Sequence, residues 1–375
     1  MMAANENESL LLGETVRLFA SRELVKNRET NDAYPFAPFW DEIVEKACGL
    51  GFFNTLLPEE LGGMGREITP LCQLIKTLSE TDASLAGIIF TNSLAQELLF
   101  VAGGEPALRD AFHERASARQ ALIACPSFIN PGEIELAAEA RRGGEAYRLY
   151  GKQDYLVLGN VASRALIPAV IAGQPGYSYF LVELSGAGVA ASAPIFSLGL
   201  HACPAVDLRL DGIEGRLVGL EGKGQEYFTQ SADRLMAALA ALAAGIMAGS
   251  LREALEYARQ RFQGGTEIIN WPEVRMILAN MAVEVKIAEM AVTQACQEAD
   301  AGRSDWPLGC RAAAIHAAEL AVRATTDGIQ VLGGVGYMKD FGQEKRYRDA
   351  QQVQALLGLA PLKKMDFIAS MIAKG

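Results

Sequence analysis

The chain has 375 residues, of which half are hydrophobic and 21% are charged, and its formal net charge is −11. This composition is typical of a compact folded protein, and the length predicts two or three structural units. The pI is near 5.0, and no run of five or more positions is dense in Lys or Arg. Nucleic acid is therefore disfavoured as a partner.

The six cysteines are scattered without a CxxC pair, and the three histidines lie far apart. We therefore expect no metal site, and we expect reduced thiols in a cytoplasmic protein. The polar, acidic N-terminus MMAANENES is unlike a secretory signal. The longest apolar run, Met236 to Gly249, has only 14 residues, whereas a membrane span needs about 20. The sequence predicts a soluble protein in which this run is a buried helix.

Residues 1–120 are predicted to form an N-terminal helical domain, because apolar residues recur there at three- and four-residue spacing. The sequence pattern changes over residues 121–222, where short runs rich in β-forming residues, such as DYLVLG and YSYFLVEL, alternate with Gly, Asn and Pro. This pattern predicts a central antiparallel β domain. Helical spacing returns over residues 223–375, which predicts a C-terminal four-helix bundle. The fold class is therefore α+β, in the order helices, strands, helices.

Two common nucleotide-binding motifs are missing from the sequence. No GxGxxG follows a predicted strand, and no GxxxxGK[ST] occurs. The glycines from Gly333 to Gly336 stand instead at the end of a predicted helix. Rossmann and P-loop modes of nucleotide binding are disfavoured for this reason.

Three segments have the spacing of a known family. They are LLPEELGGMG (56–65), YARQRFQGGTEIINWPEVRMILANMA (257–282) and TDGIQVLGGVGYMKDFGQEKRYRDAQQVQ (326–354). They resemble P.E.GG.G, YA..R.QFG.PI...Q.....LADMA and Q..GG.GY....P.E..YRDA of the acyl-CoA dehydrogenase family. The resemblance implies the fold of that family, with FAD as cofactor and an acyl-CoA thioester as substrate. It also implies an electron-transfer flavoprotein or a similar acceptor as partner, and a dimer of dimers.

The second and third segments carry residues that hold the pyrophosphate and adenosine of FAD in family members. The resemblance assigns this role to Arg261, Gln263, Gln330, Gly333 and Gly334. The chemistry is suitable, because a guanidinium binds phosphate with two donors and paired glycines let backbone amides approach closely. Taken singly, each feature is more often structural, since such glycines commonly end helices. The joint register of both segments favours the cofactor role.

The groups that contact the flavin ring in the family are mostly replaced. The family's T-E-P-x-A-G-S-D loop falls on residues 124–131, where only Pro126 is kept. The W-I-T-N segment falls on residues 155–158. Tyr155 keeps an aromatic face there, whereas Val157 lacks the hydroxyl that would reach flavin N5.

Neither position that carries the family's catalytic base holds a carboxylate. The glutamate of the usual Y-E-G-T segment becomes Leu357, and the position that carries the base in a subset of the family becomes Leu235. Asp233 matches an aspartate that serves CoA in the family, but the arginine beside it becomes Met236. The catalytic residues are therefore unknown from the sequence.

The replacements follow a pattern, because in the family's dimer each FAD lies across the subunit interface. This chain keeps the residues given to a neighbour's FAD and has lost most of those used for its own. The first hypothesis is therefore a base-less subunit that completes the FAD site of a base-bearing paralogue. The second is a self-sufficient dehydrogenase or reductase for an unusual acyl-CoA, whose base is the substrate's own carboxylate, water, or a distant residue such as Glu221 or Glu226. The third is a flavin-free protein that binds CoA thioesters or acts as a scaffold.

Overall fold

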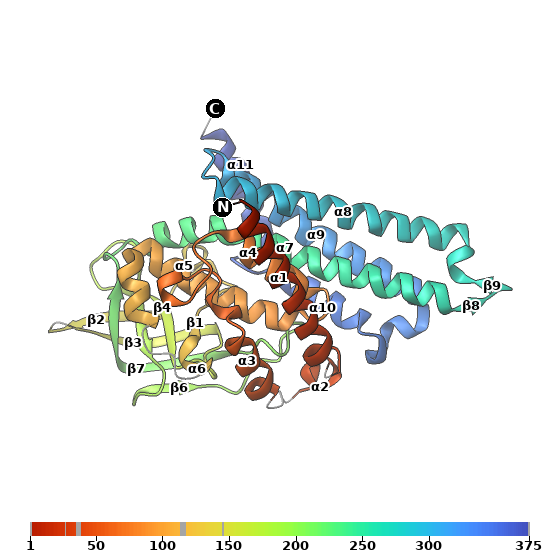
Figure 1. Ribbon diagram of the computed structural model, residues 1–375. Helices are drawn as coiled ribbons and strands as arrows, with labels where there is room; N and C mark the ends of the chain where they lie inside the picture. Colours follow the sequence, from red (N-terminus) through yellow and green to blue (C-terminus); the bar gives the residue numbers. More distant parts are fainter. Residues whose placement is uncertain (1, 27, 35–38, 113–117, 145, 374–375) are drawn as a thin grey trace.

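The computed structural model describes residues 2–26, 28–34, 39–112, 118–144 and 146–373 (Figure 1). Along the chain, helices come before and after the strands of one sheet region, as the sequence predicts. The N-terminal region consists of the helices α1 (Met2–Phe19), α2 (Arg28–Asp32), α3 (Phe39–Gly49), α4 (Ile68–Ser79), α5 (Ala83–Phe112) and α6 (Ala118–Ala121), with a π-helical turn η1 (Ala20–Leu24) and 3₁₀ turns η2 (Phe52–Asn54) and η3 (Glu59–Leu61).

The N-terminal and C-terminal helices are joined by a capping interaction. Asp300, the last residue of α8, accepts the backbone N–H of Ile68 at 2.6 Å and of Thr69 at 3.1 Å. These amides belong to the first turn of α4 and have no partner within their own helix. A carboxylate at this end of a helix also interacts favourably with the helix dipole.

The central region is one mixed sheet of seven strands. The strands are β1 (Ile123–Ala124), β2 (Ala138–Gly143), β3 (Ala146–Val157), β4 (Arg164–Ile171), β5 (Ser178–Glu183), β6 (Val189–Ala191) and β7 (Ala205–Val218). Most pairings are antiparallel, as predicted, but β1 and β2 pair with β4 in parallel over two residues each. Because β5 pairs with both β4 and β7, the strands β4, β2, β3, β7 and β5 close into a small barrel. The 3₁₀ turn η4 (Pro131–Glu133) connects β1 to β2.

The C-terminal region is built on three long helices and two shorter ones. They are α7 (Gly224–Gln260), α8 (Pro272–Asp300), α9 (Trp306–Leu332), α10 (Gln343–Val353) and α11 (Ala360–Ile372). A hairpin of β8 (Phe262–Gln263) and β9 (Thr266–Glu267), followed by the turn η5 (Ile268–Asn270), joins α7 to α8. The turns η6 (Gly333–Tyr337) and η7 (Lys339–Phe341) join α9 to α10. We keep the domain limits 1–120, 121–222 and 223–375 as a prediction.

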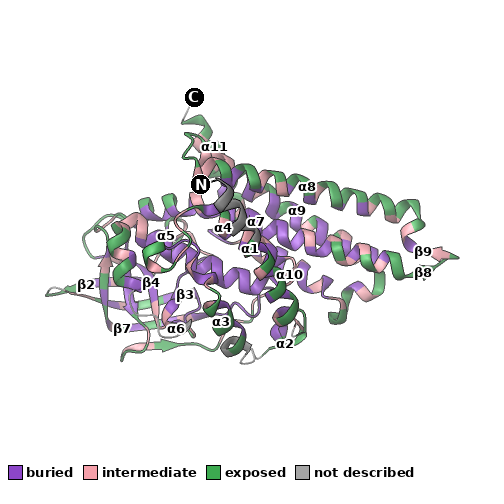
Figure 2. Ribbon diagram, in the orientation of Figure 1, coloured by how far each residue is buried: buried purple, intermediate pink, exposed green. Residues whose placement is uncertain are grey.

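Helix α7 is the central element of the core (Figure 2). Both α5 and α7 are long and apolar enough to cross a membrane by composition, but 83% of each apolar window is buried inside the protein. The predicted buried helix Met236–Gly249 is confirmed, and its cover comes from this chain itself. Gly245 faces the carbonyl of Lys76 in α4, and Gly249 faces that of Glu80 just after α4, so closely that a Cβ at either position would clash. Small residues here let two helices approach closely.

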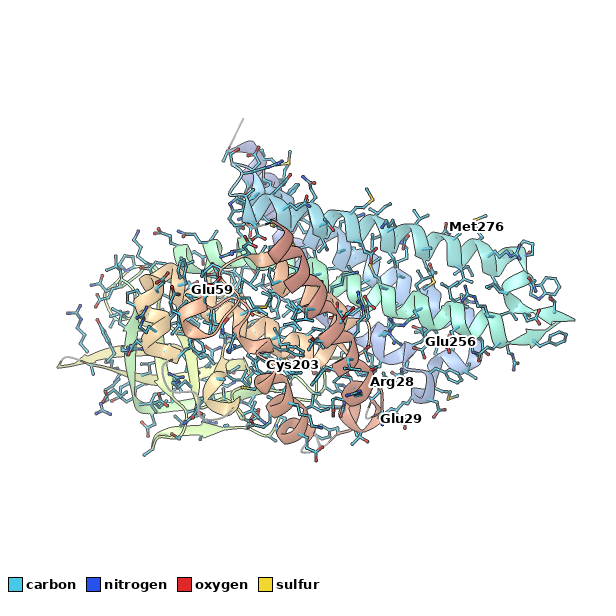
Figure 3. All side chains as sticks on the ribbon, in the orientation of Figure 1. Arg28, Glu29, Glu59, Cys203, Glu256 and Met276 are labelled. Atoms are coloured by element: carbon cyan, nitrogen blue, oxygen red, sulfur yellow. The ribbon has the colours of Figure 1, made fainter. Side chains whose placement is uncertain are left out.

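The outer face of α8 is apolar and uncovered within the chain. Met276, Val283, Ile287 and Met290 recur at helical spacing, and all four side chains are exposed. Figure 3 shows Met276 pointing away from the bundle. The sequence predicts that the helix Met236–Gly249 and the apolar face of Val274–Met290 are buried, partly against other subunits, and for the face of α8 this stays a prediction.

A buried ionic network ties α10 to the other two regions. The Nζ of Lys345 donates to Asp82 at 3.2 Å and to Asp349 at 2.6 Å, and all three side chains are at most 4% exposed. Asp82 also accepts the backbone N–H of Ser84 at the start of α5. The other carboxylate oxygen of Asp349 accepts the N–H of Leu200, which lies just before β7. One cation thus joins helices from both ends of the chain, and its partner carboxylate reaches the sheet region.

Substitution Lys345→Met should lower the free energy of unfolding by about 3–5 kcal/mol, because two buried carboxylates would lose their cation. Urea denaturation followed by circular dichroism measures this change. The matched control is Lys364→Met, since Lys364 forms only an exposed ion pair with Glu319 and should cost at most about 1 kcal/mol. Equal losses for the two variants would contradict the role of the network.

Candidate active site

The residues assigned to the FAD pyrophosphate and adenosine gather at one end of the helical bundle. Arg261 and Gln263 stand on the β8–β9 hairpin, which forms the tip of the molecule farthest from the sheet (Figure 1). A small apolar cluster packs Ile268, next to this hairpin, against Val331 and Leu332 at the end of α9. Gln330 lies in the last turn of α9, Gly333 and Gly334 follow it, and all three are exposed, as are Arg261 and Gln263. The structure thus brings the five residues into one exposed region.

Hydrogen bonds hold the hairpin in shape without using the side chains of this set. The backbone N–H of Ile268 donates to the carbonyl of Arg261 at 2.8 Å. The indole Nε1 of Trp271 donates to the carbonyl of Gln263 at 3.2 Å. The guanidinium of Arg261 and the amide of Gln263 therefore remain directed to the outside, where a second molecule can reach them.

The residues assigned to the flavin ring lie in the sheet, at the other end of the molecule. Val157 is 0% exposed, so a ring can contact its side chain only if protein atoms move. The hydroxyl of Tyr155 accepts a hydrogen bond from Gln352 at 2.7 Å, and its ring meets Phe128 edge to face with centroids 5.6 Å apart. The chain's own side chains occupy this region.

The two positions of the missing base are both buried. Leu235 is covered within α7, and Leu357 is 2% exposed in the loop between α10 and α11. The backbone N–H of Leu357 donates to the carbonyl of Ser127 at 2.8 Å. Its φ of +62° is in the left-handed region, which is unfavourable for a residue with a side chain. The loop is therefore held against the β region in a strained conformation.

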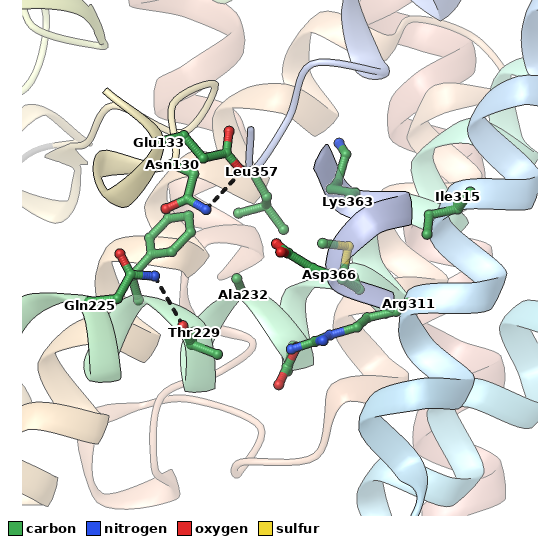
Figure 4. A pocket seen from close by; sticks show the side chains of 13 residues that line it. Asn130, Glu133, Gln225, Thr229, Ala232, Arg311, Ile315, Leu357, Lys363 and Asp366 are labelled. Carbon is green, nitrogen blue, oxygen red and sulfur yellow. Dashed lines mark hydrogen bonds and ion pairs between the residues drawn. The ribbon is translucent and has the colours of Figure 1, made fainter. Parts of the chain in front are cut away.

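A cavity of about 60 Å³ lies beside Leu357 (Figure 4). It is lined from α7, α9, α11 and the loop around η4. The lining residues are Asn130, Glu133, Gln225, Phe228, Thr229, Ala232, Asp233, Met236, Arg311, Ile315, Leu357, Lys363 and Asp366. Tyr155 and Val157, which the resemblance assigns to the flavin ring, are not among them, so they lie outside this cavity. The alternative bases Glu221 and Glu226 do not line it either: Glu221 binds Arg142 and Tyr147, and Glu226 pairs with Lys223.

Carboxylates nevertheless surround this cavity. Asp233, the predicted CoA contact, accepts a hydrogen bond from the Nε of Arg311 at 2.5 Å. Burial raises the pKa of the Asp233 carboxyl, although Arg311 acts in the opposite direction. Glu133 accepts from the Nδ2 of Asn130 at 2.9 Å and lies 3.4 Å from the backbone N of Leu359. Asp366 also lines the cavity.

Lys363 is the unusual member of this group. Its buried Nζ donates to the backbone carbonyls of Gln354 at 2.8 Å and Leu356 at 2.6 Å. Burial lowers the pKa of the Lys363 ammonium to about 8, although Glu133 raises it slightly. The sequence analysis missed this residue. The only signal was its position in α11, four residues before the half-buried Phe367 on the inner face of the helix.

A larger cleft of about 630 Å³ adjoins the cavity, and Asp233 lines both. Its floor contains the buried carboxylate of Glu97, which accepts from Arg66 at 2.6 Å and from Arg234 at 3.3 Å. The two guanidiniums share one carboxylate that is 4% exposed. Within the part of the chain that the structure describes, no group of three or more His, Cys, Asp or Glu side chains could hold a metal ion.

The residues assigned to the pyrophosphate of FAD are suitable for binding it, whereas those assigned to the flavin ring are not accessible to a ring. The exposed guanidinium of Arg261 and the amides of Gln263 and Gln330 provide suitable donors for a pyrophosphate, and Gly333 and Gly334 leave open space for its approach. Around Val157 and Leu357, by contrast, protein atoms cover the side chains. The residues assigned to the pyrophosphate and adenosine are therefore exposed, whereas Val157 and Leu357 are buried and Tyr155 is half-buried.

Two family models match the sequence. The model described as acyl-CoA dehydrogenase, N-terminal domain, matches residues 6–118. The model described as acyl-CoA dehydrogenase, C-terminal domain, matches residues 222–365. Together they cover more than half of the chain.

Individual proteins match over nearly the whole length. The chain is 28% identical to cyclohex-1-ene-1-carbonyl-CoA dehydrogenase of Syntrophus aciditrophicus (strain SB), covering 96% of this chain and 88% of the relative. It is 27% identical to 3-(aryl)acrylate reductase of Clostridium sporogenes (strain ATCC 15579), covering 97% and 98%. The solved structure of an acyl-CoA dehydrogenase complexed with FAD from Bacillus anthracis has a TM-score of 0.88 at 21% identity, covering 98% of this chain and 67% of that one. The last comparison supports the fold.

The pKa of Lys363 has a consequence for stability. Because the folded-state pKa of about 8 lies below the ordinary 10.5, the unfolded chain binds more protons between these two values. The free energy of unfolding should therefore rise by up to about 3 kcal/mol as the pH increases from 8 to 10.5. Urea titrations across this range measure the rise, and Lys363→Met should lack it. An identical pH dependence for both proteins would contradict the assignment.

Proposed function

The chain belongs to the acyl-CoA dehydrogenase family of oxidoreductases, and we propose that it is a base-less subunit of a hetero-oligomer. In this proposal, it completes the FAD site of a paralogous subunit that carries the catalytic base. The observation that supports it is the difference in exposure between two groups of residues. Those assigned to a neighbour's FAD are exposed at the tip of the bundle, whereas those assigned to the chain's own flavin ring are covered.

The tip of the bundle has the surface that a partner subunit would cover. Phe262 is 63% exposed on the hairpin, Trp271 is 41% exposed just after it, and Tyr337 is 71% exposed in η6. Aromatic residues such as these are enriched in protein interfaces. They lie on or next to the segments that carry the residues assigned to the FAD pyrophosphate, so a partner that covers them would also bring its cofactor to these donors.

In the complex, each of the five residues assigned to the FAD pyrophosphate and adenosine would have a defined task. Arg261 would donate to the FAD pyrophosphate, where a charge-assisted bond holds the cofactor and offsets its negative charge. Gln263 and Gln330 would donate amide hydrogens, and Gly333 and Gly334 would let the backbone approach. FAD supplies the two-electron redox chemistry of the family. The base for substrate deprotonation would come from the partner.

The same proposal includes the other partners implied by the family. The exposed apolar face of α8 would pair dimers into a dimer of dimers, since a contiguous apolar patch of this kind commonly marks an interface. An acyl-CoA thioester would be the substrate, and an electron-transfer flavoprotein or similar protein the acceptor. All six cysteines are free thiols, which agrees with a cytoplasmic location.

A second candidate is a self-sufficient flavoenzyme, either a dehydrogenase or a reductase. It is favoured by the carboxylates beside Leu357, because Glu133 or Asp366 could serve as a proton acceptor from a position that the family does not use. This candidate requires the covered ring region around Val157 to open. The third hypothesis, a flavin-free scaffold, would require that FAD binds neither the chain nor its complex.

The isolated chain should bind FAD weakly, and the complex with its paralogue should carry one FAD per heterodimer. Arg261→Ala should weaken FAD binding by the complex about ten- to hundredfold, because a charge-assisted hydrogen bond is worth about 1.5–3 kcal/mol. Visible absorbance after gel filtration measures both. The control is Arg259→Ala, which removes an exposed arginine two residues earlier. One FAD per subunit in the isolated chain would exclude the division of labour.

The isolated chain should also show little or no dehydrogenation of butyryl-CoA or octanoyl-CoA with an artificial electron acceptor. A well-placed general base contributes about 10²–10⁴-fold, and Leu357 cannot accept a proton. Leu357→Glu alone should not restore turnover, because the ring region would still be covered. Rapid turnover by the unmodified chain would favour the self-sufficient enzyme, and Glu133→Gln would then identify the base.

A further inference from the structure

We propose that Lys363 is an acyl-acceptor site, whose amine takes the acyl group of a short-chain thioester that enters the cavity beside Leu357. The thioester class rests on the proposed function, since acyl-CoA is the substrate implied there. The site itself rests on the geometry of the amine and of its cavity. No redox step and no flavin are involved.

The hydrogen bonds of Lys363 leave its amine ready to react. Two protons of Nζ point to the backbone carbonyls of Gln354 and Leu356. A neutral amine has two protons, so it can keep both bonds while its lone pair remains free. Lys363 makes no ion pair with any residue that the structure describes, and it lines the cavity together with Leu357 and Asp233. Burial favours the neutral form, which is the nucleophile.

Lys345, the other buried lysine among the residues that the structure describes, provides a contrast. Lys345 lies between the carboxylates of Asp82 and Asp349, and these charges raise the pKa of its ammonium despite the opposing effect of burial. Lys345 is therefore protonated and unreactive. The difference comes from the partners, because backbone carbonyls stabilise the ammonium of Lys363 less than two carboxylates stabilise that of Lys345.

The charges around Lys363 come from every element that surrounds it. Glu133 in η4, Asp233 in α7, Arg311 in α9 and Asp366 in α11 line the same cavity. A second, smaller cavity brings Glu319 of α9 and Lys364 of α11 to its other side. Two of these carboxylates already have cations, since Asp233 binds Arg311 and Glu319 binds Lys364. Glu133 and Asp366 remain, and either can receive the proton that the ammonium loses.

The cavity size limits the acyl group. A volume of about 60 Å³ has room for only a few small groups, since one water molecule needs about 10–15 Å³ of such space. This space suits a short acyl group such as acetyl, with the remainder of the thioester leading away along the face of α7 formed by Gln225, Thr229 and Ala232. A long acyl chain would not fit beside Leu357 without movement of the loop.

The reaction needs no component besides the thioester. The nitrogen of Lys363 attacks the carbonyl carbon, the C–N bond forms, and the C–S bond breaks with its electron pair going to sulfur. The proton lost by nitrogen ends on the thiolate, so that the products are an amide and a free thiol. The amide has a single N–H and no charge, so one of the two bonds to the carbonyls of Gln354 and Leu356 is lost. Acylation would thereby loosen the loop that carries Leu357.

The test incubates the full chain with acetyl-CoA, or with the small thioester S-acetyl-N-acetylcysteamine, between pH 6.5 and 9, and maps acetyl-lysine by peptide mass spectrometry. We expect acetylation of Lys363 to exceed that of Lys364, although Lys364 is 51% exposed and its neighbour is buried. The rate at Lys363 should rise about tenfold per pH unit and level off above pH 8, as its amine becomes neutral. Lys363→Arg keeps a cationic donor and should remove the modification while Lys364 is labelled as before.

Greater acetylation of Lys364 than of Lys363 with both thioesters would overturn the proposal, as would a rate at Lys363 that does not depend on pH. Labelling of Lys363 by the small thioester supports the acceptor site whether or not acetyl-CoA reacts faster. An advantage for acetyl-CoA would additionally support binding of CoA by this chain. The proposed role in FAD binding is tested separately by flavin stoichiometry, so either idea can fail without the other.

Discussion

The structure depends on the buried charges of α10. Lys345 lies between Asp82 and Asp349, and Asp349 also holds the backbone of Leu200. Next to them, Arg348 binds Asp32 of α2 and the carbonyl of Leu198. Buried charges are stable only when their partners are in place, so the N-terminal helices, the sheet and α10 must assemble together. The position of α10 in turn determines where the loop that carries Leu357 begins.

This constraint also keeps the backbone around Leu357 in an unfavourable conformation. Tyr155, Leu158 and Leu357 all have positive φ values, which cost free energy in residues with a side chain. Such conformations are maintained only where the surrounding structure forces them. Here the closed barrel holds β3 at one side, and the hydrogen bond from Leu357 to Ser127 holds the loop at the other. The backbone is strained at these positions, and the side chains of Leu158 and Leu357 are apolar.

Much of the fold could be predicted from the sequence, because apolar periodicity reports helices and strands locally. The buried helix at Met236–Gly249 and the order of the three regions follow from it. The closure of the barrel and the parallel pairing of β2 with β4 could not be predicted, since they depend on contacts between strands distant in sequence. The family resemblance predicts that Leu357 stands at the position of the usual base. It gave no reason to examine Lys363 or Glu133, which reach the cavity from separate elements.

The replacement at Leu357 changes what the surrounding residues can do. A carboxylate at this position would lie in the same cavity as Lys363 and would stabilise its ammonium, as Asp349 does for Lys345. With leucine there, Lys363 has only backbone carbonyls as close partners, and its neutral form becomes accessible near physiological pH. In these proposals, the absence of a carboxylate and the reactivity of the amine both follow from the leucine at one position. A subunit that leaves deprotonation to its partner, as proposed, would still hold an amine that reacts with a thioester.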